Sequence, residues 1–353
     1  MKKLLVAAIL GAALAGAQAG LPPAEAPPRI GLIDFYGRRK VPEAAIRKAL
    51  AAKEGDPLPR SKGDAEERLE AIPGVVRAWI EAACCEDGKA ILYVGIEERG
   101  APHFDFHPAP DGLARLPMAI HDEYTRFLAA VGLAVRAGET AEDLRQGHSL
   151  MANANARRHQ ERFAELAAAH LPALQSVLRT SGDAEHRAIA AYVIGYAPDK
   201  VAVVNDLQQA LRDPDDTVRN NAMRSLGAIS VLAMRKAQEP KDPDQDPRTV
   251  LRVSPTWFIE MLDSLIWSDR TTAAVTLVTL TESRDAQVLA HLRERSAGVL
   301  AEMARWKHLP HALPAFILLG RAMGVPEDRI QQAWTSGDRE AFIAGLLKPP
   351  KKR

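Results

Sequence analysis

The chain has 353 residues, a formal net charge of +1 and two cysteines. This length allows two or three domains, while the balanced charge does not provide the strongly basic field that nucleic-acid binding needs. Aromatic residues make up 5% of the chain, and their scarcity, with abundant alanine, favours helix packing over a β-sandwich.

Residues 1–19 have the pattern of a secretory signal peptide. Two lysines precede an apolar run at residues 4–15, which is too short to span a bilayer comfortably. Small residues at the −3 and −1 positions predict cleavage after Ala19. A Pro-rich spacer follows at residues 20–29. We therefore expect a soluble, exported protein, periplasmic or secreted, with no membrane span in the mature chain.

Residues 30–99 predict a compact α+β domain in the order strand, helix, helix, strand, strand. Pro42 suits the first turn of a helix, and Asp87-Gly88 is a tight hairpin signal between the last two strands. This segment resembles a POTRA domain, and the resemblance rests on the following residues and stretches: Gly37, Val41, Leu50, 53–57, Leu69, 72–75 and 94–98.

The resemblance implies a way of binding a partner. POTRA domains bind extended polypeptide by adding a strand to a sheet edge. Trp79 and Tyr93, on the face expected to lie opposite the core, are candidate contacts for such a ligand, or else ordinary half-exposed aromatic residues. No barrel-type strands follow in the sequence, so a role in barrel assembly is not carried over.

The two cysteines are neighbours on a predicted strand. Adjacent strand residues point to opposite faces, so a bridge between Cys84 and Cys85 would need a strained ring. We expect a buried Cys84 and a partly exposed Cys85. In an oxidising compartment, the alternative is an intermolecular disulfide through Cys85.

A linker at residues 100–117 is rich in proline and glycine, which break regular structure. Within it, His103, Asp105 and His107 would share one face of an extended chain and could approach a metal. Zinc sites need a third or fourth protein ligand or water, and none can be assigned, so a plain linker is favoured.

Residues 118–170 predict a helical lead-in that caps a repeat array. Thr140 and Asp143 indicate a helix cap before Leu144. Glu142, Asp143, His148 and Ser149 cluster here in the sequence, but acidic residues near a helix start commonly serve the cap and the helix dipole.

The strongest internal pattern is a repeat of 32 residues. Residues 183–195 and 215–227 share an aspartate, an arginine, a small residue, an aliphatic residue and a glycine at the same spacing. Such a period indicates stacked helix pairs, because one pair alone cannot bury its apolar stripe. In the second copy, Ala222 is predicted to face inward, with Asn221 and Arg224 facing outward.

The phrase at residues 211–227 resembles the HEAT repeat. This implies an all-α solenoid over residues 171–347, with an inserted loop at 239–254 and a basic tail at 348–353. In this family the aspartate and arginine of each turn form a ladder between repeats. On this chain the resemblance assigns that ladder to Asp183, Arg187, Asp215, Arg219, Asp269 and Arg270.

These features predict a non-catalytic adaptor in the cell envelope. The expected partner is a protein or peptide, bound through the solenoid surface and a sheet edge, and no cofactor, metal or nucleic acid is expected. No nucleophile elbow, phosphate loop or dinucleotide fingerprint occurs in the sequence. The alternative is a HEAT-like enzyme, related to bilin lyases or acting as a metal-dependent hydrolase.

Overall fold

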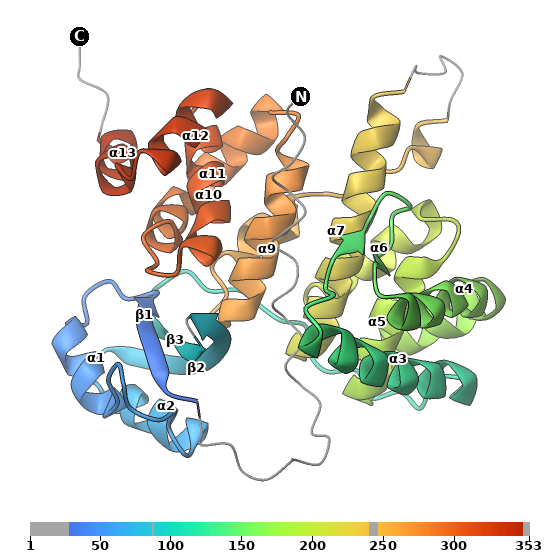
Figure 1. Ribbon diagram of the computed structural model, residues 1–353, viewed down its shortest axis with the longest axis horizontal. Coiled ribbons are helices and arrows are strands. Elements are labelled where there is room, and N and C mark those ends of the chain that lie inside the picture. Colours follow the sequence, from blue (N-terminus) through green and yellow to red (C-terminus); the bar gives the residue numbers. More distant parts are fainter. Residues whose placement is uncertain (1–27, 87, 240–245, 349–353) are drawn as a thin grey trace. The chain divides into compact units, whose positions relative to one another are not determined.

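The computed structural model describes residues 28–86, 88–239 and 246–348. A small N-terminal sheet is followed by a mostly helical body, which confirms the predicted fold class at that level, and thirteen α-helices lie in the described parts (Figure 1). None of these helices combines the length and apolar character that crossing a membrane requires. The predicted signal peptide, most of the spacer and residues 349–353 lie outside the described residues.

The described chain divides into two compact units. One consists of residues 105–257, which we call the repeat unit. The other, the sheet unit, combines residues 28–104 with residues 258–348. The N-terminal strands and the last helices, which the sequence assigned to separate domains, therefore share one unit.

The sheet unit begins with the predicted order of elements. They are β1 (Ile30–Tyr36), α1 (Glu43–Leu50), α2 (Lys62–Glu70), β2 (Val75–Glu86) and β3 (Lys89–Glu98). The strands form one sheet in the order β1-β3-β2, in which β1 is parallel and β2 antiparallel to β3.

The two faces of this sheet are both covered (Figure 1). On one face, Ile80, Leu92 and Val94 form a buried core with Ile46 and Leu69 from the two helices. Because side chains alternate along a strand, Tyr93 points to the other face. There it packs on C-terminal helices of the same unit.

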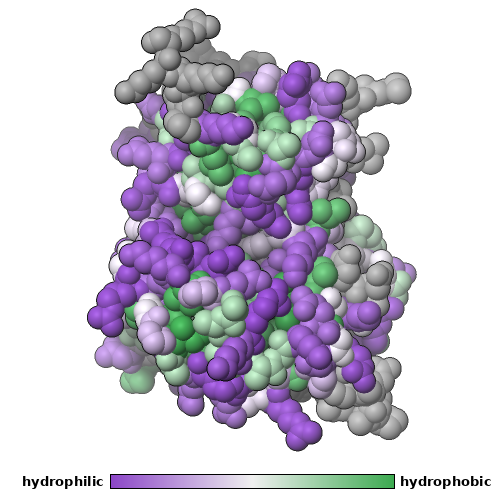
Figure 2. Space-filling view, turned by 90° about the vertical axis from the view of Figure 1, so that its left-hand side faces the viewer, coloured by the Kyte–Doolittle hydropathy of each residue, from purple (hydrophilic) through white to green (hydrophobic). Residues whose placement is uncertain are grey.

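The C-terminal part of the sheet unit is helical. They are α8 (Thr256–Met261), whose first two residues lie in the repeat unit, α9 (Trp267–Leu280), α10 (Ala286–Met303), α11 (Leu309–Ala322), α12 (Glu327–Thr335) and α13 (Arg339–Leu347). The face shown in Figure 2 is mostly hydrophilic, with small apolar areas scattered between charged side chains.

The outer edge of β2 is covered by acidic side chains of α2. The backbone N–H of Ala78 donates to Glu70 Oε1 at 3.0 Å, and that of Ile80 donates to Glu66 Oε1 at 2.7 Å. Unpaired edge amides are a template for strand addition, and proteins cover them in this way. The sheet edge is therefore already occupied at these two amides.

Removing both carboxylates should uncover this edge. We expect Glu66→Ala with Glu70→Ala to lower the free energy of unfolding by about 1–3 kcal/mol, because two buried amides lose charged acceptors. We also expect concentration-dependent self-association in analytical ultracentrifugation. Glu67→Ala, on the exposed side of the same helix, is the control and should sediment as the wild type does. Equal behaviour of the two variants would contradict the covered-edge interpretation.

In its described residues, the repeat unit contains five complete α-helices and a short hairpin. The helices are α3 (Met118–Arg136), α4 (Ala154–Thr180), α5 (Ala184–Val193), α6 (Val201–Ala210) and α7 (Asp216–Ala237). α4 has a non-helical residue at His170, two residues before Pro172, and proline within a helix is a common cause of such a kink. The kink separates the predicted lead-in from the first repeat.

Residues 142–151 form a hairpin, which corrects the predicted helix start at Thr140 and Asp143. Its strands are β4 (Glu142–Asp143) and β5 (Leu150–Met151). The Asp143 carboxylate binds Arg145 instead of a helix terminus. Met151 N–H donates to the buried Gln160 side chain at 2.6 Å, so the hairpin is held against α4.

Candidate functional site

Three repeated arginines close the turns of the helix pairs in the same way. Each donates to the backbone carbonyl six residues before it: Arg187 to Ser181, Arg219 to Asp213, and Arg270 to Ser264. All three side chains are buried. The weak third copy of the sequence repeat thus shares the contact of its arginine with the carbonyl six residues earlier, although Arg270 donates through Nε and the other two arginines through a terminal nitrogen.

The aspartates of the repeat have a different role from the predicted ladder. Asp183 and Asp215 cap α5 and α7, each accepting two backbone N–H groups from the first turn. Asp269 lies one residue before Arg270 and accepts from the Ser264 hydroxyl at 2.7 Å, so it has no equivalent in the earlier copies.

The contact between repeats runs from Arg187 to Asp213 of the next turn. Their side chains form a bidentate pair with distances of 2.7 and 2.8 Å. The Asp213 carboxylate is the main cause of the raised pKa of the Arg187 guanidinium. Of the predicted ladder residues, Arg187 makes the contact between repeats, with Asp213 in place of Asp183 or Asp215, whereas Arg219 bonds to carbonyl groups of its own turn. The aspartates were misassigned because helix capping and ion pairing both favour aspartate at a turn.

An extended segment of the chain, which we call the strap (residues 105–117), crosses these turns. Near its start, His107 N–H donates to Arg212 O at 2.6 Å. Further along, Gly112 N–H donates to Thr180 O, and Gly182 N–H donates to Gly112 O, both at 2.8 Å. Along the chain, the strap first contacts the turn before α7, which we call the second turn, and then the turn before α5, which we call the first turn. Its direction is therefore opposite to the order of the repeats.

Side chains anchor the strap at both turns. The Arg219 guanidinium lies 4.2 Å from the centre of the Phe106 ring, a cation–π geometry. At the other turn, Arg115 pairs with Asp183. The predicted linker is thus an ordered part of the repeat surface.

The histidines of the predicted metal motif are not gathered into a ligand set. Among residues 28–86, 88–239 and 246–348, no three His, Cys, Asp or Glu side chains are close enough to hold one ion. His107 is used through its backbone in the strap, and burial is the first cause of its lowered pKa, followed by the nearby Arg212.

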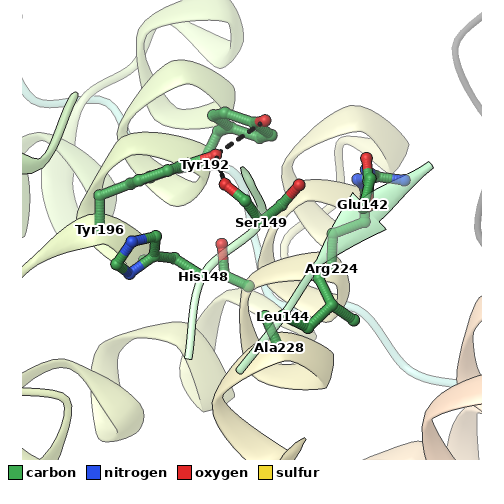
Figure 3. Close-up of a pocket in the computed structure, with 10 residues that line it drawn as sticks. Glu142, Leu144, His148, Ser149, Tyr192, Tyr196, Arg224 and Ala228 are labelled. Atoms are coloured by element: carbon green, nitrogen blue, oxygen red, sulfur yellow. Dashed lines mark hydrogen bonds and ion pairs between the residues drawn. The ribbon is translucent and has the colours of Figure 1, made fainter. Parts of the chain in front are cut away.

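A small polar pocket lies beneath the 142–151 hairpin (Figure 3). The hairpin contributes Glu142, His148 and Ser149, while α5 with its following turn and α7 supply the facing residues. Tyr196 donates its hydroxyl to Ser149 O at 3.0 Å and lies 3.1 Å from the Tyr192 hydroxyl.

The charged groups in this pocket, and Lys200 beside it, are paired or desolvated. Arg224 donates to Glu142 Oε1 at 2.9 Å, and Glu142 raises the pKa of Arg224 against the opposing effect of burial. Lys200 donates to Gly195 O at 2.6 Å and lies 3.1 Å from His148 Nδ1. Burial lowers the pKa of Lys200 to about 8.

The pocket is small. The space open to the centre of a water molecule is about 20 Å³, which suffices for one water. Glu142 Oε2 is buried and has no hydrogen-bond partner among the described residues, so a water bound there would satisfy it. The pocket therefore has room for a structural water beside Glu142.

Most residues of this pocket were not predicted from the sequence. Arg224 and Asn221 were predicted to face outward, yet both are largely buried. Asn221 donates to Ala188 O at 2.9 Å. Polar residues in an alanine-rich helix indicate an exposed face unless another segment covers them. Arg224 is covered by the 142–151 hairpin, and that segment was predicted to be the start of a helix.

The predicted partner contacts on the sheet have different surroundings. Tyr93 is fully buried; its ring stacks on Trp267 with centroids 4.4 Å apart, and its hydroxyl lies 2.6 Å from His311 Nδ1. This corrects its interpretation as an accessible contact. Trp79 is partly exposed, with the Lys62 amine 3.1 Å from its ring centre.

The cysteine pair is described only in part. Cys84 is exposed and takes part in a disulfide, which corrects the predicted buried position. The other cysteine of the chain is Cys85, whose side chain lies outside the described residues. A disulfide at Cys84 within one chain would use Cys85 and so weighs against the predicted intermolecular bridge through Cys85.

Comparisons with known proteins bear on the helical part. Neither the curated proteins nor the solved structures yielded a match to the chain. Residues 171–244, from the second half of α4 to beyond α7, match the family model of HEAT repeats. Together with the 32-residue period and the turn-closing arginines, this match supports a HEAT-repeat architecture for that segment.

Proposed function

We propose that this protein is a non-catalytic adaptor that is exported to the cell envelope and binds polypeptide partners through its repeat unit. HEAT repeats generally mediate protein–protein interaction, which supports the class of partner. The signal-peptide pattern of residues 1–19 supports export.

One observation carries the choice of surface. The turns of the repeat unit already hold an extended polypeptide, the strap, through backbone hydrogen bonds at Gly112 and His107. The sheet edge of β2 is the less favourable surface, since Glu66 and Glu70 occupy two of its amides. We therefore assign partner binding to the repeat unit first.

Site-specific photo-crosslinking in cells tests this assignment. A photoreactive residue at the exposed Thr217, in the first turn of α7, should give a discrete crosslinked species in the periplasmic fraction. The same residue at the exposed Lys48 of α1 is the control. Absence of a discrete product at Thr217, or an equal product at Lys48, would count against partner binding by the repeat unit.

Export has its own test. Intact-mass measurement of the protein from the periplasmic fraction should give a chain that begins at Gly20. A full-length chain in the cytoplasmic fraction would contradict export and leave the binding proposal standing.

A further inference from the structure

We infer that the row of turns in the repeat unit is a binding site for an extended polypeptide that carries an aromatic residue followed six positions later by glycine, and that the strap occupies this site in cis. This inference rests on the proposed function and names the surface and the ligand class. Phe106 and Gly112 of the strap define that spacing.

The contacts available to such a ligand are mostly main-chain contacts. The strap backbone makes five hydrogen bonds. The N–H groups of His107 and Gly112 donate to the carbonyls of Arg212 and Thr180, and the N–H of Leu116 donates to His186 Nδ1. The carbonyls of Asp105 and Gly112 accept from Arg212 Nε and from the N–H of Gly182. Backbone bonds do not depend on sequence, so another extended chain can make the same set.

Two positions of the strap give the site its selectivity. A Cβ atom at Gly112 would lie 2.3 Å from Thr180 O, so a ligand needs glycine where it crosses the first turn. An aromatic ring is needed at the second turn to cover the Arg219 guanidinium, as Phe106 does at 4.2 Å. An arginine three residues after the glycine would repeat the Arg115–Asp183 pair.

The strap is held where it crosses the two turns and is exposed between them. Leu113, beside the glycine crossing, is 90% exposed, and His107, Pro108 and Ala109 are also exposed. Little apolar surface is buried between the two turns, so the contacts at the turns hold most of the segment. A competing ligand with the same anchors can therefore replace the strap turn by turn.

The test uses a fluorescein-labelled synthetic peptide with the sequence of residues 105–117 and the full mature chain. Gly112→Ala should dislodge the strap through the clash with Thr180 O. We expect this variant to bind the peptide on the order of tenfold more tightly than the wild type. In the wild type the strap occupies the site most of the time, and the apparent affinity is reduced in proportion to the fraction of molecules whose site is free. Gly132→Ala, where the nearest atom to an added Cβ is the end of Arg136 at 3.8 Å, is the matched control and should behave as the wild type.

A second peptide, N-methylated at the residues equivalent to His107 and Gly112, should lose binding, because it lacks both donors. Should Gly112→Ala fold poorly, Phe106→Ala with Arg115→Ala removes only side-chain anchors and takes its place. The inference is overturned if a folded strap variant binds no more peptide than the wild type, or if the N-methylated peptide binds equally well.

The outcome separates this inference from the proposed function. Crosslinks at Thr217 that persist unchanged in the strap variants, without peptide binding, would keep the adaptor role and remove the turns as its site. Peptide binding without any crosslinked partner would keep the site and remove the adaptor role.

Discussion

Asp213→Ala is expected to lower the free energy of unfolding of the repeat unit by about 3–5 kcal/mol. The substitution leaves the Arg187 guanidinium, which is 2% exposed, without its bidentate partner. A buried charge stripped of its counter-ion has a cost of this size. Urea denaturation followed by circular dichroism at pH 7.5 measures the loss.

Two further variants separate the ion pair from its surroundings. Arg187→Met with Asp213→Leu removes both charges and should recover most of the loss, since apolar replacement of a whole buried pair is often near neutral. Glu161→Ala breaks the exposed pair with Arg157 in the same unit and should cost less than about 0.5 kcal/mol. Similar losses for Asp213→Ala and Glu161→Ala would show that the inter-repeat pair is not a principal contact.

The sequence was most informative where one physical requirement acts on a residue. Each repeat needs a capped helix, a turn between its two helices and a face that stacks on the next repeat. The 32-residue period therefore predicted α5, α7 and the arginines that close their turns. The order of elements in the sheet was also predictable, because strand alternation, Pro42 and the hairpin turn each act locally.

The sequence was least informative where distant segments meet. Tyr93 appears half-exposed on a strand considered alone and is buried because C-terminal helices of the same unit bring Trp267 and His311 to it. Arg224 became a pocket residue because the 142–151 hairpin covers it. No local sequence pattern predicts these contacts. A carboxylate that pairs with a distant arginine, as Glu142 does with Arg224, looks the same in the sequence as a carboxylate near a helix start.

Acid is expected to destabilise the sheet unit because the buried His311 takes up a proton when the chain unfolds. His311 is 7% exposed, between the Tyr93 hydroxyl and the His308 ring, whose centre is 4.0 Å from its own. Burial, and secondarily His308, lower the pKa of His311 to about 3. The folded protein therefore keeps this ring neutral at pH values where the unfolded chain protonates it.

The sign of the effect follows from proton linkage. The contribution of His311 is fully present above its unfolded pKa of about 6.5 and is lost as pH falls toward the folded value, by up to about 1.4 kcal/mol per pH unit. Between pH 6.5 and 4.5 the wild type should lose roughly 2–3 kcal/mol from this group. The measurement is the urea midpoint at both pH values.

His311→Gln isolates the histidine from the carboxylates. Burial raises the pKa values of Asp34, Glu81 and Glu302 in the same unit, so these groups act in the opposite direction, but they are common to both proteins and cancel in the difference. Glutamine keeps a polar partner for the Tyr93 hydroxyl and cannot titrate. The variant should therefore be less stable than the wild type at pH 7.5 and approach or exceed it at pH 4.5. A difference between the two proteins that does not change with pH would show that His311 packs in the unit without controlling its response to acid.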